Sequence, residues 1–125
     1  MFKVTAPAQM NETFARAVNS RNLQAVLSLF EPDAALRIGD ATLRGHQAIS
    51  REFETLLALP GAMTSRNNFC IEHGDIALLR ADWIIAHDGQ VIARGNSAEI
   101  ARRQPDGTWL YIVDHPAGAA LPPVA

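Results

Sequence analysis

Residues 75–115 decide the fold, and they read DIALLRADWIIAHDGQVIARGNSAEIARRQPDGTWLYIVDH. Three runs rich in aliphatic, β-branched and aromatic residues follow one another, separated by Asp88-Gly89 and by Pro105-Asp106-Gly107. An Asp-Gly pair supplies the positive φ angles of a two-residue hairpin, and Pro-Asp-Gly is typical of a type I turn followed by a glycine bulge. The stretch therefore predicts a meander of three antiparallel strands, over residues 76–87, 90–104 and 108–114.

The residues before this meander predict helices with a small hairpin between them. Apolar residues recur at helical spacing in residues 5–20 and again from residue 22 to residue 31, where Pro32 ends the second helix. The rest predicts a short hairpin, a third helix and a further strand, over residues 34–44, 45–59 and 63–72. Helices followed by an antiparallel sheet indicate an α+β layer fold. We expect one domain over residues 1–118 and an irregular tail over residues 119–125.

The composition limits the classes of function. The chain has 125 residues and a formal net charge of -2, with its Lys and Arg residues scattered, so nothing predicts a surface for nucleic acid or membrane. No apolar run approaches the roughly 20 residues of a membrane span and no secretory pattern opens the chain, so we expect a soluble, cytoplasmic protein. Cys70 is the only cysteine, and the four histidines are not at metal-ligand spacing. We therefore expect no disulfide, no metal site and no cofactor.

The strand over residues 76–87 is apolar on both of its faces. An antiparallel sheet with one face in water alternates apolar and polar residues, yet both alternate sets of this strand are mostly aliphatic. The predicted helices suffice to cover only one face of the sheet. We therefore expect the second face to be buried against another copy of the chain, in a homodimer.

Counting residues back from the two turns assigns side chains to the two faces of the sheet. If Asp88-Gly89 is a two-residue loop, Trp83 lies opposite Arg94; if Pro105-Asp106-Gly107 is a three-residue loop, Asp114 lies opposite Ala98. The face toward the helices then carries Trp83, Arg94, Asn96 and Asp114, and the partner face carries Ser97, Glu99, Trp109, Tyr111 and His115. A β-bulge in these long strands would exchange the two faces beyond it.

Three features carry a resemblance to a known family. Gly45-His46-Gln47-Ala48-Ile49 opens the third helix, and Asp106-Gly107-Thr108-Trp109 leads into Ile112-Val113-Asp114-His115-Pro116. Together with the order of the elements, these motifs resemble the SnoaL-like branch of the nuclear transport factor two and ketosteroid isomerase superfamily, over about residues 8–118. The resemblance implies a cone-shaped fold in which three N-terminal helices and a curved antiparallel sheet enclose an apolar pocket, and a homodimer formed through the outer sheet face. This fold hosts isomerases, cyclases, hydrolases, dehydratases and non-enzymatic modules.

Asp114 is the first candidate for chemistry. SnoaL-type cyclases, by this resemblance, have an acidic residue late in the fold, and Asp114 on the last predicted strand matches that position. An apolar wall raises the pKa of a carboxyl group, which then acts as base or acid beside a carbonyl; ketosteroid isomerase is the standard example of this principle. Phe14 stands where the isomerase pattern has a tyrosine donor, so ketosteroid isomerisation itself is not predicted. The alternative is a structural carboxylate at a strand end, bonded to backbone before Pro116.

Three further residues of the same predicted face are candidates for ligand binding. Trp83 is either a flat wall for an aromatic ligand or an ordinary core residue. Arg94 and Asn96 can orient a carbonyl or carboxylate, although Arg94 can instead stack on Trp83 as a structural pair. We expect a domain that binds a small, largely apolar organic molecule and that, if catalytic, is a cofactor-independent isomerase, cyclase or lyase. The rival interpretation is a non-catalytic ligand-binding or dimerisation module.

Overall fold

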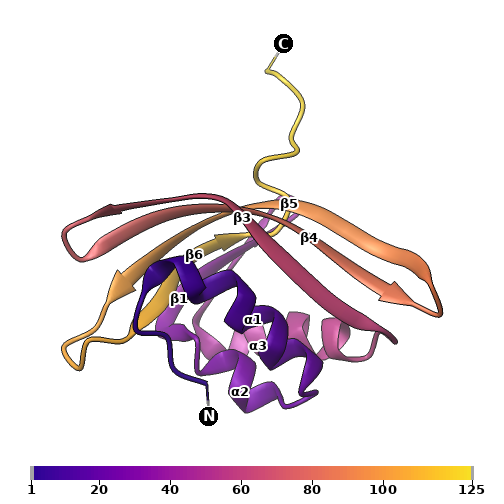
Figure 1. Cartoon of the computed structure of the whole chain (residues 1–125), viewed down its shortest axis with the longest axis horizontal. Coiled ribbons are helices and arrows are strands. Elements are labelled where there is room, and N and C mark those ends of the chain that lie inside the picture. Colours follow the sequence, from indigo (N-terminus) through magenta and orange to yellow (C-terminus); the bar gives the residue numbers. More distant parts are fainter. Residues whose placement is uncertain (1, 125) are drawn as a thin grey trace.

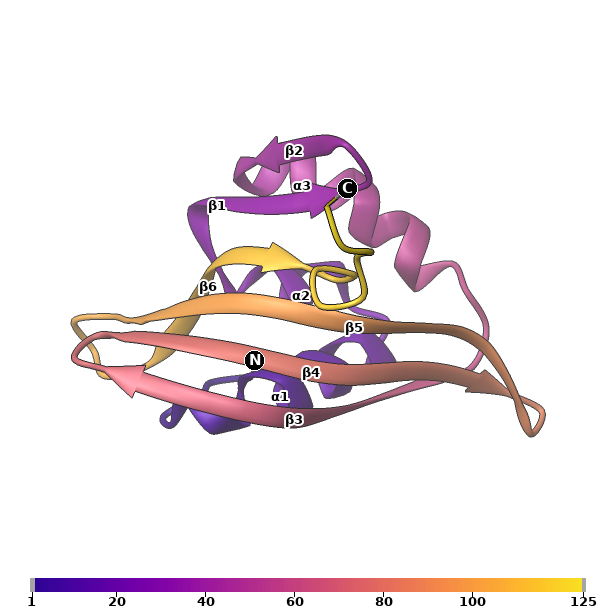
Figure 2. The same cartoon turned by 90° about the horizontal axis from the view of Figure 1, so that it is seen from above.

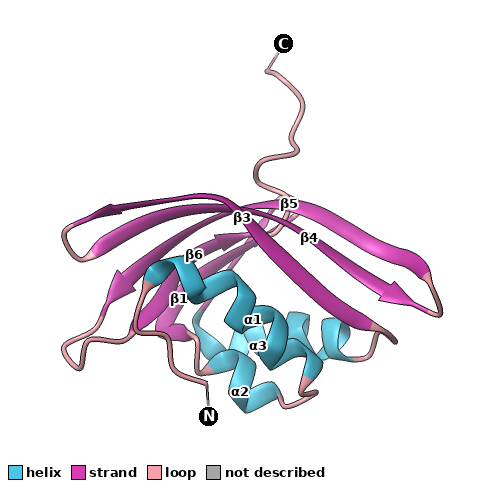
Figure 3. Ribbon diagram, in the orientation of Figure 1, coloured by secondary structure: helices cyan, strands magenta, loops and turns pink. Residues whose placement is uncertain are grey.

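The computed structural model describes residues 2–124 and contains one curved sheet with helices packed on one of its sides (Figure 1). The helices are η1 (Pro7–Gln9, a 3-10 turn), α1 (Met10–Asn19), α2 (Leu23–Leu27) and α3 (Gly45–Leu57). The strands are β1 (Phe30–Ile38), β2 (Ala41–Arg44), β3 (Ala62–His73), β4 (Ile76–His87), β5 (Gln90–Arg103) and β6 (Trp109–His115). Figure 3 shows the helical layer beneath the arch of the strands. The predicted α+β class is confirmed.

The six strands form a single sheet in the order β2-β1-β6-β5-β4-β3, which Figure 2 shows from above. β1 pairs with β6 in parallel, whereas the other neighbouring strands are antiparallel, so the prediction of a wholly antiparallel sheet was wrong at this pair. β1 also begins at Phe30, which was predicted to lie in the second helix. The amide of Tyr111 donates to the carbonyl of Leu29 at 2.8 Å, and this pairing with β6 overrides the helical periodicity.

Both hairpin loops have the predicted lengths, but a β-bulge interrupts each pair of strands. His87 pairs with Gln90 as expected, and the register then slips by one residue at Ile92, so that Trp83 lies opposite Gly95. The register of β5 with β6 likewise slips at Ile112. Each extra residue turns the side chains beyond it to the other face of the sheet.

The first bulge turns toward the helices several side chains that were predicted to face a partner. Ser97 and Glu99 are buried on the helix side, as is Tyr111 on β6. Asp114 lies on this side too, because the second bulge falls between it and Tyr111. Asp114 therefore faces Glu99 in the register, and not Ala98 as predicted.

The first bulge, at Ile92, also moves two candidate residues away from the helices. Arg94 pairs with Ile84 and is exposed, and the amide of Asn96 donates to the Asp82 carboxylate at 2.5 Å. Both residues lie on the outer face of the sheet. Their expected position beside Trp83 on the helix side was wrong.

An aromatic cluster joins the helices to the sheet. The rings of Phe30 on β1 and Tyr111 on β6 have centroids 4.9 Å apart, and Phe30 lies 5.1 Å from Phe53 on α3. Phe14 on α1 completes the cluster with edge contacts to the other three rings. Such tilted and edge-on pairs stabilise a core beyond the area that they bury, so they hold α1 and α3 at a set distance from the sheet.

Two polar side chains attach the helices to β3 and to the loop before it. Asn19 at the end of α1 pairs its amide with the backbone of Met63, donating to the carbonyl at 2.9 Å and accepting from the N–H at 2.7 Å. The Arg21 guanidinium donates to carbonyls at the end of α3 and just beyond it, those of Leu57, Leu59 and Gly61. These contacts satisfy backbone groups at an edge strand and at a helix end, where no ladder or helical partner exists.

The chain beyond β6 turns back over the sheet. The amide of Ala119 donates to the carbonyl of Asn96 at 3.0 Å, and residues 121–124 have no regular secondary structure. Ala125, the last residue of the predicted tail, lies outside the described residues. Within residues 2–124, no helix has the length and apolar character needed to cross a membrane.

Candidate functional site

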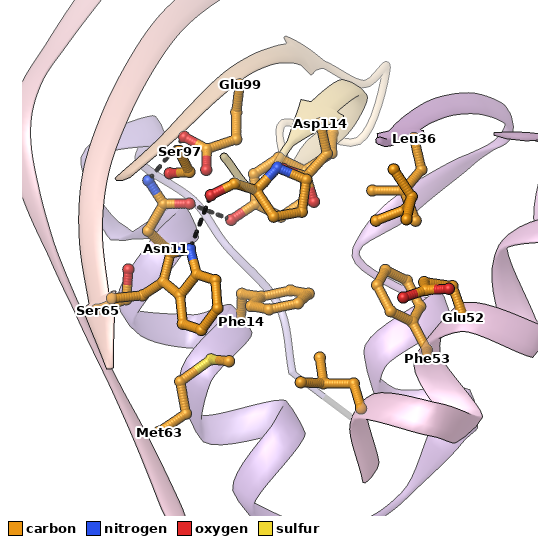
Figure 4. A pocket seen from close by; sticks show the side chains of 15 residues that line it. Asn11, Phe14, Leu36, Glu52, Phe53, Met63, Ser65, Ser97, Glu99 and Asp114 are labelled. Carbon is orange, nitrogen blue, oxygen red and sulfur yellow. Dashed lines mark hydrogen bonds between the residues drawn. The ribbon is translucent and has the colours of Figure 1, made fainter. Parts of the chain in front are cut away.

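A cavity of about 240 Å³ lies between the helices and the inner face of the sheet (Figure 4). Its walls are mostly aliphatic and aromatic. The sheet contributes two carboxyl groups and several hydroxyl groups, and the helices contribute Asn11 and Glu52. None of the residues that line it is a Lys, an Arg or a His. The lining consists of Asn11, Phe14, Leu36, Ile38, Glu52, Phe53, Leu56, Met63, Ser65, Trp83, Ser97, Glu99, Tyr111, Asp114 and Pro116.

Trp83 on β4 forms one wall of the cavity, and Gly95 makes room for its ring. A Cβ atom on Gly95 would stand 2.5 Å from the indole Nε1, which is closer than nonbonded atoms approach. The Trp83 Nε1–H donates to the carbonyl of Pro116 at 2.9 Å. This bond holds the first residue after β6 against the cavity.

Two carboxyl groups occupy the sheet wall of the cavity. Glu99 on β5 and Asp114 on β6 are partners in the register, which places their Cβ atoms about 5 Å apart. Their side chains are 5% and 6% exposed. Burial disfavours the charged form of a carboxyl group, and it raises the pKa of Glu99 to about 7. Burial, and then the charge of Glu99, raise the pKa of Asp114 well above its ordinary range.

Hydrogen bonds distinguish the two carboxyl groups. Glu99 accepts a hydrogen bond from Nδ2 of Asn11 at 3.2 Å, and the hydroxyl of Ser97 also acts to lower the pKa of Glu99. Within residues 2–124, no donor contacts the carboxyl of Asp114, and the backbone bond of the alternative interpretation is not formed. Because donors stabilise the ionised form, these hydrogen bonds favour ionisation of Glu99 over ionisation of Asp114.

Asn11 on α1 connects this pair to Tyr111. The Tyr111 hydroxyl donates to Oδ1 of Asn11 at 2.6 Å. Burial, with the charges of Glu99 and Asp114, raises the pKa of Tyr111 well above its ordinary value, so the hydroxyl stays protonated and remains a donor. The site therefore contains a carboxyl whose pKa is raised to about 7, a second carboxyl whose pKa is raised well above its ordinary range, and an amide between α1 and the sheet.

The structure brings together two of the four candidate site residues. Trp83 and Asp114 line the cavity, whereas Arg94 and Asn96 do not. Glu99 was assigned to the other face, and Asn11 was not considered. Gly95 was the available signal for Glu99, because a glycine inside a strand often marks a bulge or a close approach.

A signal for Asn11 was present as well. It precedes Phe14 by three residues and therefore lies on the apolar stripe of α1, where a polar side chain is unusual.

Within residues 2–124, no group of three or more His, Cys, Asp or Glu side chains is arranged to hold a metal ion.

The sequence matches a family model described as the SnoaL-like domain over residues 11–112. The chain belongs to the SnoaL-like family. No curated protein matches the sequence at a significant level.

Solved structures share the fold of this SnoaL-like chain. A proposed calcium/calmodulin-dependent protein kinase type II association domain from Thiobacillus denitrificans has a TM-score of 0.76 at 18% identity, covering 92% of this chain and 96% of that one. A proposed ketosteroid isomerase from Parabacteroides distasonis has a TM-score of 0.65 at 21% identity, covering 80% and 77%. A proposed dehydratase of the NTF2-like family from Streptomyces avermitilis has a TM-score of 0.65 at 16% identity, covering 85% and 88%. At these identities the likeness shows the fold alone.

Proposed function

We propose that this SnoaL-like domain binds a small, neutral carbonyl compound in its cavity and moves a proton on it without a cofactor. The pair formed by Glu99 and Asp114 carries this proposal. With a pKa of about 7, Glu99 is close to half ionised at neutral pH, while Asp114 beside it keeps its proton. A base is most effective when its pKa lies near the working pH, and a neutral carboxyl group can donate to a carbonyl oxygen.

The size and charge of the cavity support the ligand class. A cavity of about 150 Å³ accommodates benzene, so one of about 240 Å³ has room for one or two rings. Glu52, Glu99 and Asp114 line it without any cationic side chain. A ligand carboxylate would be buried beside these groups with no counter-charge, which is costly. A neutral ligand avoids that cost.

The proposed step is an enolisation. The Glu99 carboxylate takes a proton from the carbon next to the carbonyl, and the electron pair of that C–H bond forms a C=C bond. The π pair of the C=O bond takes the proton of Asp114 and becomes an O–H bond. Glu99 ends protonated and Asp114 ionised, so charge is conserved. Isomerases, cyclases and lyases that act beside a carbonyl can all begin with this step. When the product forms, Glu99 gives up its proton and Asp114 takes one back, which restores both groups.

Proton exchange in deuterated buffer tests this step directly. 2-Tetralone is neutral, has two rings and carries acidic protons next to its carbonyl, and ¹H NMR follows their replacement by deuterium. We expect the protein to accelerate exchange over buffer, and Glu99→Gln to reduce the acceleration by about 10²- to 10⁴-fold. Asp114→Asn should reduce the acceleration less than Glu99→Gln does, because an amide still donates a hydrogen bond to the carbonyl oxygen. Equal exchange by the wild-type protein and both variants would overturn the proposal.

Apolar side chains on the outer sheet face support a second candidate function, dimerisation without catalysis. On this face Ile71 is 56% exposed, Leu78 is 44% exposed and Val113 is 39% exposed. A contiguous exposed apolar surface of this kind is typical of a protein interface. We propose that a second copy of the chain covers it. Dimer formation without any exchange of the 2-tetralone protons would favour this candidate, whereas exchange with dimer formation would show both functions.

A further inference from the structure

A chain of hydrogen bonds runs from a backbone carbonyl to the carboxyl pair. Nδ2 of Asn67 on β3 donates to the carbonyl of Ala8 at 2.7 Å, and Oδ1 of Asn67 accepts from Nδ2 of Asn11 at 2.9 Å. Nδ2 of Asn11 also donates to Oε1 of Glu99 at 3.2 Å, and Oδ1 of Asn11 accepts from Tyr111 at 2.6 Å. The two amides therefore link η1, α1, β3, β5 and β6. Figure 4 shows Asn11 between the helix and the sheet wall that carries Glu99.

The direction of this chain is set by its first member. A backbone carbonyl can only accept a hydrogen bond, so Asn67 must turn its NH₂ group to Ala8 and its oxygen to Asn11. That oxygen also only accepts, so Asn11 must turn its NH₂ group toward Asn67, which is the end that faces Glu99. Flipping either amide would place acceptor against acceptor. Asn11 thus presents an N–H to Glu99 whatever the protonation state of the pair.

We infer that Asn11, oriented by Asn67, is a positioning residue that makes Glu99 the proton acceptor of the pair and leaves the proton on Asp114. A fixed N–H donor stabilises a carboxylate and offers no acceptor to a neutral carboxyl group. Asp114 has no such donor within residues 2–124. The catalytic meaning of this asymmetry rests on the proposed proton transfer, but the asymmetry itself is measurable without turnover.

The other groups around Glu99 do not supply a donor of fixed direction. The Ser97 hydroxyl donates to the carbonyl of Ala81 at 3.3 Å, and it also acts to lower the pKa of Glu99. A hydroxyl both donates and accepts, so Ser97 can serve either protonation state of Glu99. The Tyr111 hydroxyl donates its hydrogen bond to Asn11 and not to Glu99. The proximity of Asp114 makes a second negative charge costly but does not decide which of the two carboxyl groups carries the first. Glu52 on α3 is the remaining titratable group of the lining, and no Lys, Arg or His contributes to it. Among the described residues around Glu99, Nδ2 of Asn11 is the donor whose direction the hydrogen bonds fix.

Carboxyl ¹³C NMR of protein labelled at the Asp and Glu side chains tests the inference. The resonances of the pair are assigned from their absence in Glu99→Gln and Asp114→Asn, and both are followed through a pH titration. In the wild-type protein we expect Glu99 to titrate first. In Asn11→Ala its midpoint should rise by about one pH unit, a tenfold gain in proton affinity. Asn67→Ala should shift the midpoint in the same direction by less, because Asn11 then loses only its orientation.

A neighbouring amide provides the matched control. Asn68 follows Asn67 on β3, but its amide donates to Asp82 at 3.1 Å on the outer face, so Asn68→Ala should leave the midpoint of Glu99 unchanged. If Asn11→Ala does not fold, Asn67→Ala carries the test, because the side chain of Asn67 is exposed. An unchanged Glu99 midpoint in folded Asn67→Ala and Asn11→Ala, or prior ionisation of Asp114 in the wild-type protein, would overturn the inference. If the two carboxyl groups titrate as expected but the protein does not exchange the protons of 2-tetralone, the inference about Asn11 is supported and only the proposed function is overturned.

Discussion

Gly95 on β5 faces Trp83 on β4, and the missing side chain at position 95 leaves the space that the indole ring occupies. The same indole donates to the carbonyl of Pro116, the first residue beyond β6. One glycine therefore positions both a wall of the cavity and the start of the C-terminal turn. The relationship is steric, because Gly95 has no left-handed backbone angle that would demand a glycine.

Gly95→Ala should displace Trp83 from the cavity wall. A methyl group at this position overlaps the ring, and overpacking of this kind costs about 1–3 kcal/mol of unfolding free energy. The bond from Nε1 to Pro116 should break, since the ring must move. Chemical denaturation measures the loss of stability, and the fluorescence of Trp83 reports the changed surroundings of the ring, after subtraction of the signal from Trp109 measured in Trp83→Phe.

A double-mutant cycle with Trp83→Ala separates this clash from other effects of the alanine. In the Trp83→Ala background the space is empty, so Gly95→Ala should cost little or should stabilise the strand. The same loss of stability in both backgrounds would refute the steric explanation.

Local signals predicted the strands of the meander and both hairpin loops, but not the bulges. Asp88 and Gly89 have φ angles of 50° and 78°, as a two-residue hairpin requires. Gly95 indicates an irregularity in β5 but does not place the bulge at Ile92, and no glycine or proline lies beside Ile112. The bulge at Ile92 brings Gly95 opposite Trp83, a fit between two strands that the neighbouring residues alone do not reveal. Register near a turn is therefore predictable, whereas register many residues away from the turn is not.

The predicted position of Asp114 on the helix side was right because one bulge compensates for the other. The first bulge exchanges the faces of β5 and so brings Glu99 to the inside, and the second does the same to β6 between Tyr111 and Asp114. The prediction therefore found one carboxyl group of the site and missed its partner. Phe30 shows the same limit, because its apolar spacing fits a helix while its contacts with β6 make it a strand residue.

Stability should fall as the pH rises through 7, because Glu99 binds a proton more tightly in the folded protein. Its pKa is raised from 4.5 to about 7, so this contribution is fully present below about pH 4.5 and is lost as the pH rises through about 7. Glu99→Gln should therefore gain stability relative to the wild-type protein between pH 5 and pH 8, by at most about 3 kcal/mol. Urea unfolding at a series of pH values gives the difference curve.

Glu31 supplies a control of opposite sign. The hydrogen bonds from Arg102 lower the pKa of Glu31, so its contribution is present above its ordinary range and is lost as the pH falls. Glu31→Gln should therefore differ from the wild-type protein most at neutral pH and least in acid. A difference curve for Glu99→Gln that is flat, or that slopes like the one for Glu31→Gln, would contradict the burial of a protonated Glu99.

The cavity should discriminate ligands by charge. 2-Acetylnaphthalene and 2-naphthoate have similar size, but the second carries a carboxylate in place of the acetyl group. At pH 8, where Glu99 is largely ionised, we expect 2-naphthoate to bind at least tenfold more weakly, which corresponds to about 1.4 kcal/mol. Isothermal titration calorimetry measures both affinities. The difference between the two affinities should become smaller at pH 5.5 and in Glu99→Gln. A difference that is independent of pH and unchanged in this variant would show that Glu99 does not face the ligand.

Leu78→Asp should weaken association of the chain with a second copy. Leu78 lies on the outer face of β4 beside Ile71 of β3, and a carboxylate there must be desolvated when two such faces meet. Light scattering at micromolar concentration should report a dimer for the wild-type protein and a monomer for this variant. Leu121→Asp is the control, because Leu121 is 62% exposed but lies in the tail beyond the sheet, so this variant should remain dimeric. If the wild-type protein is a monomer, no second copy covers this face. If both variants dissociate equally, the contact between copies does not lie on this face.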